Sequence, residues 1–147
     1  GLLHRLFPRA RFLVAKRTPA AIAWSIFSND FVGRHPYANA LDSLGVACGN
    51  ERYLSRHWLE RLPAQATEVN YEALVEDFEH EISRVLAFIG LEMDAACIDF
   101  YRQRTVVRTA SSWQVRRPLY RSSTDKWRRY EAHLGPFFAS LNGTAVP

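Results

Sequence analysis

Residues 11–27 read RFLVAKRTPAAIAWSIF, and this stretch says most about the architecture of the chain. Its apolar run over residues 11–15 predicts a buried β-strand. Thr18 can cap a helix and Pro19 suits a first helical turn, so a helix is expected to follow. The chain is therefore expected to pass directly from a strand into a helix around Arg17.

The remaining pattern predicts an α/β protein in which helix is in excess. A second, short strand is expected over residues 67–71. Gly45 and Gly49 are expected to weaken one helix, and Gly90 is expected to cap another. The segments expected to be helical are residues 2–7, 38–62, 78–89, 95–104 and 125–141, with an interruption near Gly135, while residues 105–123 predict a long loop.

Length and composition indicate one folded, soluble domain. The chain has 147 residues, of which 48% are hydrophobic and 13% aromatic, and this composition excludes a disordered or low-complexity chain. Its apolar stretches are far shorter than the roughly 20 residues that a membrane-spanning helix needs. Cys48 and Cys97 lack CxxC spacing and a neighbouring His pair, so neither a zinc site nor a disulfide framework is indicated. The cytoplasm is the expected compartment.

Charge is strongly segregated along the chain. The formal net charge of +4 combines basic residues 1–17 and 101–130 with an acidic middle. The first segment holds five basic residues and no acidic one, and the second holds nine basic residues against Asp125 alone. A nucleic-acid binder is expected to be basic more uniformly. Two basic segments that meet in the fold would form one concentrated anion site.

The junction between the first strand and its helix is a candidate anion site. Backbone amides at the start of a helix favour phosphate or sulfate, and Arg17 lies at that corner. Ser25 follows eight residues later, about two helical turns, so its hydroxyl and the Arg17 guanidinium could hold one phosphate together. The alternative is that Arg17 is a solvated arginine at a strand end and Ser25 an ordinary helix residue.

Two stretches of the sequence resemble sulfotransferases. Residues 7–19, continuing to Ser25, resemble the strand and helix that bind the 3′-phosphate of 3′-phosphoadenosine 5′-phosphosulfate, with Arg-x-Pro after an apolar strand and Ser eight residues after the Arg. Residues 69–77, VNYEALVED, resemble the RYEDLVxDP element of the same family, and Phe88-Ile89-Gly90-Leu91 follows it in the same order.

The C-terminal third is similar to the signature of bacterial sulfotransferases that often carry tetratricopeptide repeats upstream, which are in turn similar to tyrosylprotein sulfotransferases. The matching stretches are residues 107–111, 114–116, 118–123 and 127–130. The resemblance implies the helix-rich portion of a P-loop-type fold with a short parallel sheet.

The resemblance also implies roles for individual residues. Arg17 and Ser25 are expected to hold the 3′-phosphate, with Lys126 at the same phosphate and Tyr71 near the adenosine. Ser111 is expected to open a loop that wraps the nucleotide and continues through Gln114 to Tyr120. The family usually has Asp or Asn in place of Thr18 and often Gly in place of Asp125, whose carboxylate adds a negative charge beside the expected anion.

The implied activity is transfer of a sulfuryl group from that donor to a hydroxyl or amine acceptor, with 3′,5′-adenosine bisphosphate as product and no metal ion. None of the seven glycines forms the Gly-rich phosphosulfate-binding loop of the family. Residues 1–147 are therefore expected to be one sulfotransferase domain without that N-terminal loop, incomplete as an isolated chain. The catalytic residues and the acceptor are unknown from the sequence, and neither nucleic acid nor a membrane is an expected partner.

Two alternatives remain open at this point. A non-catalytic basic module could bind nucleic acid or an acidic partner, because Arg, Trp and Tyr are interleaved over residues 113–130 and could stack bases while neutralising phosphates. A fragment of a related P-loop kinase would instead prefer ATP to a 3′-phosphorylated nucleotide.

Overall fold

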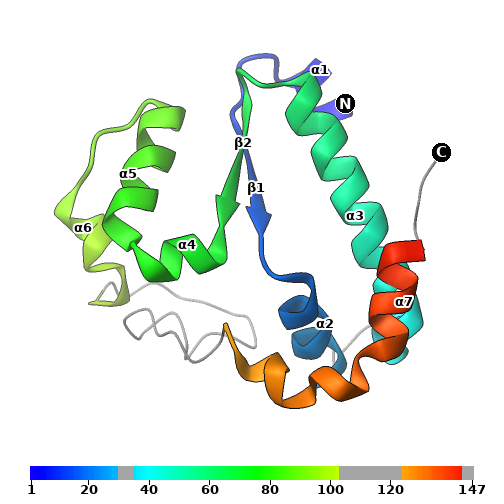
Figure 1. The fold of residues 1–147 in the computed structure, drawn as a ribbon. Coiled ribbons are helices and arrows are strands. Elements are labelled where there is room, and N and C mark those ends of the chain that lie inside the picture. Colours follow the sequence, from blue (N-terminus) through cyan, green and yellow to red (C-terminus); the bar gives the residue numbers. More distant parts are fainter. Residues whose placement is uncertain (30–34, 103–123, 144–147) are drawn as a thin grey trace.

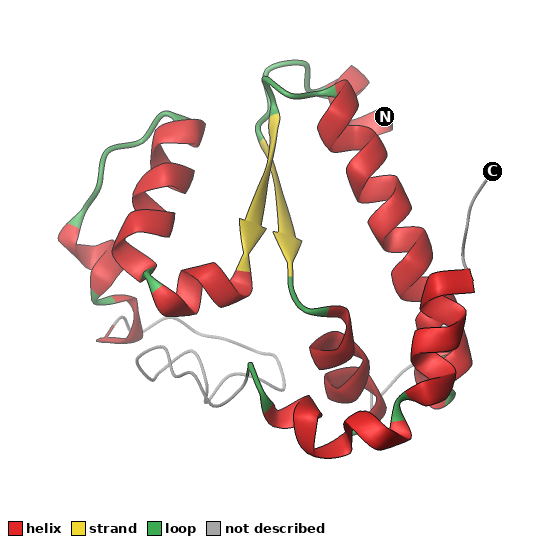
Figure 2. Cartoon of the chain, in the orientation of Figure 1, coloured by secondary structure: helices red, strands yellow, loops and turns green. Residues whose placement is uncertain are grey.

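The computed structural model describes residues 1–29, 35–102 and 124–143, and within them helices surround one short sheet (Figures 1 and 2). The first half contains α1 (Leu2–Leu6), β1 (Phe12–Lys16), α2 (Pro19–Phe27), the 3₁₀ helix η1 (Pro36–Asn39) and α3 (Leu41–Arg61). The second half contains β2 (Ala66–Asn70), α4 (Tyr71–Glu76), α5 (Phe78–Ile89), α6 (Ala95–Ile98), the 3₁₀ helices η2 (Phe100–Arg102) and η4 (Lys126–His133), and α7 (Gly135–Gly143).

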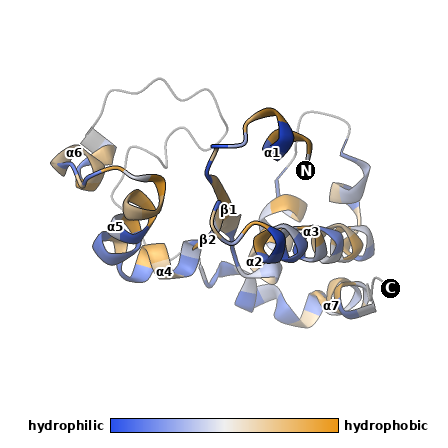
Figure 3. Cartoon of the chain, turned by 90° about the horizontal axis from the view of Figure 1, so that it is seen from above, coloured by the Kyte–Doolittle hydropathy of each residue, from blue (hydrophilic) through white to orange (hydrophobic). Residues whose placement is uncertain are grey.

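The sheet pairs β1 with β2 in parallel, in a register that runs from Phe12 opposite Ala66 to Lys16 opposite Asn70. Both strands point toward the helices that follow them, α2 and α4, as the arrows in Figure 2 show. Helices α2, α3 and α7 lie on one side of the strands, and α4, α5 and α6 lie on the other (Figures 1 and 3). The predicted helix-rich α/β arrangement with a short parallel sheet is therefore confirmed for the described residues.

Strand β1 is more exposed than predicted. Burial alternates along it, and Leu13 is 45% exposed. Leu13 and Ala15 are both exposed and lie on the same face, because side chains alternate along a strand, so the described residues leave that face of the sheet uncovered. The expectation of a buried strand was wrong for this reason, although the direct passage from β1 into α2, with Pro19 in the first helical turn, is confirmed.

The core lies between α2, α3, η4 and α7. Its buried members are Ala20 and Ala23 of α2, Leu44 of α3, Phe137 of α7, and Leu134 between η4 and α7. Helices α3 and α7 pack side by side (Figures 1 and 3). A Cβ atom added to Gly45 would lie 2.5 Å from the Phe137 carbonyl oxygen, so the closeness of the two helices depends on glycine there.

Gly45 therefore does not interrupt its helix. Helix α3 is continuous through both Gly45 and Gly49, which are buried, and the predicted weakness between them was wrong. The loss of helix propensity at a glycine is about 1 kcal/mol, which the packing against α7 offsets.

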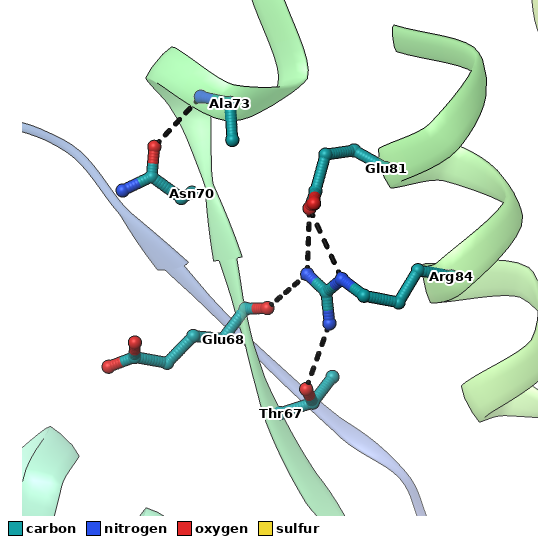
Figure 4. A network of polar contacts seen from close by, with 6 residues as sticks. All are labelled: Thr67, Glu68, Asn70, Ala73, Glu81 and Arg84. Carbon is teal, nitrogen blue, oxygen red and sulfur yellow. Dashed lines mark hydrogen bonds and ion pairs between the residues drawn. The ribbon is translucent and has the colours of Figure 1, made fainter. Parts of the chain in front are cut away.

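Helix α5 matches its prediction and is fixed to β2 by an arginine. The Asp77 side chain accepts a hydrogen bond from the His80 N–H at 3.2 Å at its start, and Gly90, with φ of 79°, ends it. In Figure 4 the Arg84 guanidinium donates to the Glu68 carbonyl at 2.7 Å and to Glu81 at 2.8 Å. Arg84 thereby ties α5 to the strand whose end carries Tyr71.

Two predicted C-terminal helices differ from expectation. The described part of the first, residues 95–102, forms the short α6 and then the 3₁₀ helix η2, in which the Phe100 ring lies 5.6 Å from the ring of Phe78 on α5. Residues 126–133 form a 3₁₀ helix, which brings side chains three residues apart onto one edge. Trp127 and Tyr130 lie on such an edge, Trp127 against the core and Tyr130 stacked on Trp24 of α2 with ring centroids 3.6 Å apart.

Within the described ranges, every helix falls short of a membrane-spanning segment in length or in apolar character.

Candidate functional site

The ends of the two parallel strands bring Arg17 and Tyr71 together. Lys16 and Asn70 are opposite each other in the register, so the residues that follow them leave the sheet at the same edge. The Arg17 guanidinium carbon lies 4.8 Å from the centroid of the Tyr71 ring, which is the geometry of a cation–π contact. Two predicted site residues, 54 positions apart, thus form one contact at the carboxyl end of the sheet.

Glu72 makes a second link between the ends of the two strands. Its Oε1 accepts a hydrogen bond from the Thr18 backbone N–H at 2.8 Å. Burial works to raise the pKa of Glu72, but the hydrogen bonds from Thr18 and the positive charge of Arg17 outweigh it and hold that pKa below its ordinary value. Glu72 is therefore a charged part of this corner, and the sequence analysis missed it. The available signal was an acidic residue directly after Tyr71.

The backbone at the start of α2 offers fewer donors than predicted. The Thr18 N–H is bonded to Glu72, Pro19 has no N–H, and the Ala21 N–H donates to the Thr18 carbonyl at 2.9 Å. Thr18, Pro19 and Ala21 therefore present no free backbone N–H to an anion in this arrangement, and anion binding by the backbone amides of the helix stays a prediction.

Ser25 and Lys126 lie on elements that pack together, but neither contacts Arg17 in a bond among the described residues. Ser25 is half-buried on α2, where its carbonyl accepts a hydrogen bond from the Asn29 side chain at 2.6 Å. Lys126 is exposed at the first residue of η4, the element that packs on α2. The structure thus places both on the α2 side of the Arg17 corner.

A small cavity of about 300 Å³ joins the start of α2 to α4 and to the start of η4. Thr18 and Glu72 line it together with Asp125, Trp127 and Arg128. The described part of the C-terminal basic segment therefore reaches the start of α2, next to Arg17. The Asp125 carboxylate is bound by the Arg128 guanidinium at 2.9 Å, and this contact raises the pKa of Arg128. The charge of Asp125 is thus balanced within η4.

A larger, open cavity of about 1190 Å³ lies on the α3 side of the same corner. Lys16 and Arg17 line it from the sheet, and Arg52 and Arg56 line it from α3. The Lys16 ammonium forms an ion pair with Glu51 at 3.1 Å. Arg17 thus lies beside a space large enough for a ligand of nucleotide size.

Two of the aromatic residues on which the nucleic-acid alternative depends are used for packing. Trp127 lies against the core, and Tyr130 stacks on Trp24. Their rings contribute to folding in this arrangement. The remaining predicted residues of the nucleotide loop, Ser111, Gln114 and Tyr120, lie outside the described residues, as does residue 113.

Comparison with known proteins agrees with the general resemblance to sulfotransferases. The family model described as "Sulfotransferase family" matches residues 1–95, which include both strand ends and the Arg17–Tyr71 contact. A protein of Aquifex aeolicus (strain VF5), described as an "Uncharacterized protein", is 34% identical over 144 residues. That match covers 96% of this chain, and the chain spans 19% of the length of that relative. The chain belongs to the sulfotransferase family.

Proposed function

We propose that this chain binds the nucleotide end of 3′-phosphoadenosine 5′-phosphosulfate in an enzyme that transfers the sulfuryl group to a hydroxyl or amine acceptor. The observation that carries the proposal is the Arg17 guanidinium against the Tyr71 ring at the ends of two parallel strands, in a chain of the sulfotransferase family. Arg17, Ser25 and Lys126 take the 3′-phosphate, and Tyr71 lies beside the adenosine.

The arrangement of Arg17 suits it for a phosphate. A guanidinium makes charge-assisted hydrogen bonds of roughly 1.5–3 kcal/mol each and can bind two phosphate oxygens at once. Contact with the Tyr71 ring reduces the rotational freedom of the Arg17 side chain before the ligand arrives. Less conformational entropy is then lost on binding, which favours affinity.

The proposed reaction is a displacement at sulfur. The acceptor oxygen or nitrogen forms a bond to sulfur while the bond from sulfur to the bridging 5′-phosphate oxygen breaks, and the acceptor proton passes to a base. Cationic groups stabilise the charge that develops on the leaving nucleotide. Because the sequence has no Gly-rich loop of the expected kind, we place the sulfuryl-binding loop and the base outside residues 1–147. Ser111, Gln114 and Tyr120 complete the proposed nucleotide site.

Calorimetric titration of the full chain with 3′,5′-adenosine bisphosphate tests the proposal. Replacing Arg17 by Ala should weaken binding at least about tenfold, because one charge-assisted contact to the phosphate is lost. Arg9→Ala is the matched control, since Arg9 is exposed before the opposite end of β1 and loses the same charge. Its affinity should stay within about twofold of the unchanged chain.

Absence of binding, or equal binding by the Arg17→Ala variant, would falsify the proposal. ATP binding more tightly than the 3′-phosphorylated nucleotide would favour the kinase alternative. Tight binding of oligonucleotides with a steep salt dependence, and no preference for the mononucleotide, would favour the basic-module alternative.

A further inference from the structure

A carboxylate occupies the corner where the proposed phosphate binds. Glu72 reaches from the first turn of α4 to the start of α2, and its Oε1 accepts the Thr18 N–H bond at 2.8 Å. It lines the cavity of about 300 Å³ that lies between the start of α2, α4 and the start of η4. Glu72 therefore connects the two strand ends and at the same time adds a negative charge to an anion site.

Glu72 and Arg17 influence each other through their charges. The positive charge of Arg17 favours the ionised form of Glu72, and by reciprocity Glu72 stabilises the Arg17 cation. The negative charge of Glu72 therefore partly cancels the positive charge of Arg17 that attracts an incoming phosphate. The same contact holds the backbone that carries Arg17 close to Tyr71.

We propose that Glu72 is a positioning residue that also limits the affinity of the site for its nucleotide. Its acceptor oxygen holds the Thr18 backbone, which keeps Arg17 against Tyr71, and its negative charge competes with the 3′-phosphate for Arg17. The consequence is faster release of 3′,5′-adenosine bisphosphate after sulfuryl transfer. This inference rests on the proposed function.

The two roles of Glu72 can be separated by substitution. Glu72→Gln keeps an oxygen that accepts the Thr18 N–H bond and removes the charge. Glu72→Asp keeps the charge on a shorter side chain. Glu76→Gln is the matched control, because Glu76 lines the same cavity from the same helix and its side chain makes no hydrogen bond or ion pair to another described residue.

The experiment measures affinity and dissociation rate of 3′,5′-adenosine bisphosphate for the full chain and these variants. Glu72→Gln should tighten binding about fivefold at low salt, mainly by slowing dissociation, since a partly exposed charge pair contributes up to about that factor. The gain should shrink as salt is added. Glu76→Gln should change affinity less than twofold, and Glu72→Asp should give no gain.

Three results overturn the inference: unchanged or weaker binding by Glu72→Gln, an equal gain in Glu76→Gln, or an equal gain in Glu72→Asp. Should Glu72→Gln fail to fold, the Glu72→Asp and Glu76→Gln results still decide, because a gain in either contradicts the role of the Glu72 charge. If the unchanged chain binds the nucleotide and Arg17→Ala does not, while Glu72→Gln gives no gain, this inference fails alone. If the unchanged chain does not bind, the proposed function fails with it.

Discussion

The link that Glu72 makes between the two strand ends depends on pH. Its carboxylate is preferred over its acid form in the folded chain, because it accepts hydrogen bonds from Thr18 and lies near Arg17. A carboxyl group whose pKa is lowered by folding contributes stability above its unfolded pKa and loses that contribution as the pH falls through its folded pKa. The Thr18–Glu72 link should therefore weaken in acid and be fully present at neutral pH.

Urea unfolding at pH 7 and pH 3 checks this effect. The unchanged chain should lose more stability between these values than Glu72→Gln, whose amide does not titrate, and the difference should be under about 1 kcal/mol because the group is partly solvated. Glu81 also has a lowered pKa, from its bond to Arg84, but it is present in both proteins and its contribution cancels. An equal loss in both proteins would show that Glu72 is not held in its charged form by this corner.

At the scale of elements, the contact between α3 and α7 depends on one glycine. A Cβ atom on Gly45 would lie 2.5 Å from the Phe137 carbonyl oxygen and 2.7 Å from the Ser140 Cβ. The first of these is a backbone atom, so α7 would have to move as a whole.

Gly45→Ala should therefore destabilise the chain by about 1–3 kcal/mol, although alanine has the higher helix propensity. Gly135→Ala is the control, because nothing lies within 4 Å of a Cβ atom added there. Thermal unfolding should show a lower Tm for Gly45→Ala and an unchanged or slightly higher Tm for Gly135→Ala. A Gly45→Ala chain as stable as the unchanged one would mean that α7 does not pack this closely.

At the scale of the whole molecule, the position of the candidate site depends on the core that holds α2 in place. Ala20 and Ala23 of α2 pack with Leu44 and Phe137, and the helix that they anchor begins two residues after Arg17. The position of the Arg17 guanidinium thus depends on the packing of α2 against α3 and α7 as well as on the sheet.

Phe137→Ala should cost about 3–5 kcal/mol, because the side chain is 0% exposed and its removal leaves a cavity. Domains of this kind are stable by about 5–15 kcal/mol, so the variant should unfold at a clearly lower urea concentration. Phe138→Ala, at the half-buried neighbour, should cost less. Equal midpoints for the two variants would contradict the placement of Phe137 at the centre of the core.

Local features of the sequence were sufficient to predict several of the helices and strands. The passage from β1 to α2 follows from an apolar run next to Thr18 and Pro19, and the end of α5 follows from Gly90. These features depend on residues within one or two turns of each other, so periodicity and capping preferences reveal them. Arg17 could be named as a candidate site residue from its place at the end of the first strand, whereas Tyr71 was named from the resemblance to sulfotransferases.

Only the tertiary structure decided how these pieces meet. The parallel register puts Tyr71 beside Arg17 and turns Glu72 onto Thr18, and close packing against α7 keeps α3 continuous at Gly45. The exposure of β1 likewise depends on what covers the sheet, which its own residues do not specify. The contacts of Tyr71, Glu72 and α7 join segments more than 50 residues apart, and local sequence patterns carry no information on the register or distance of such contacts.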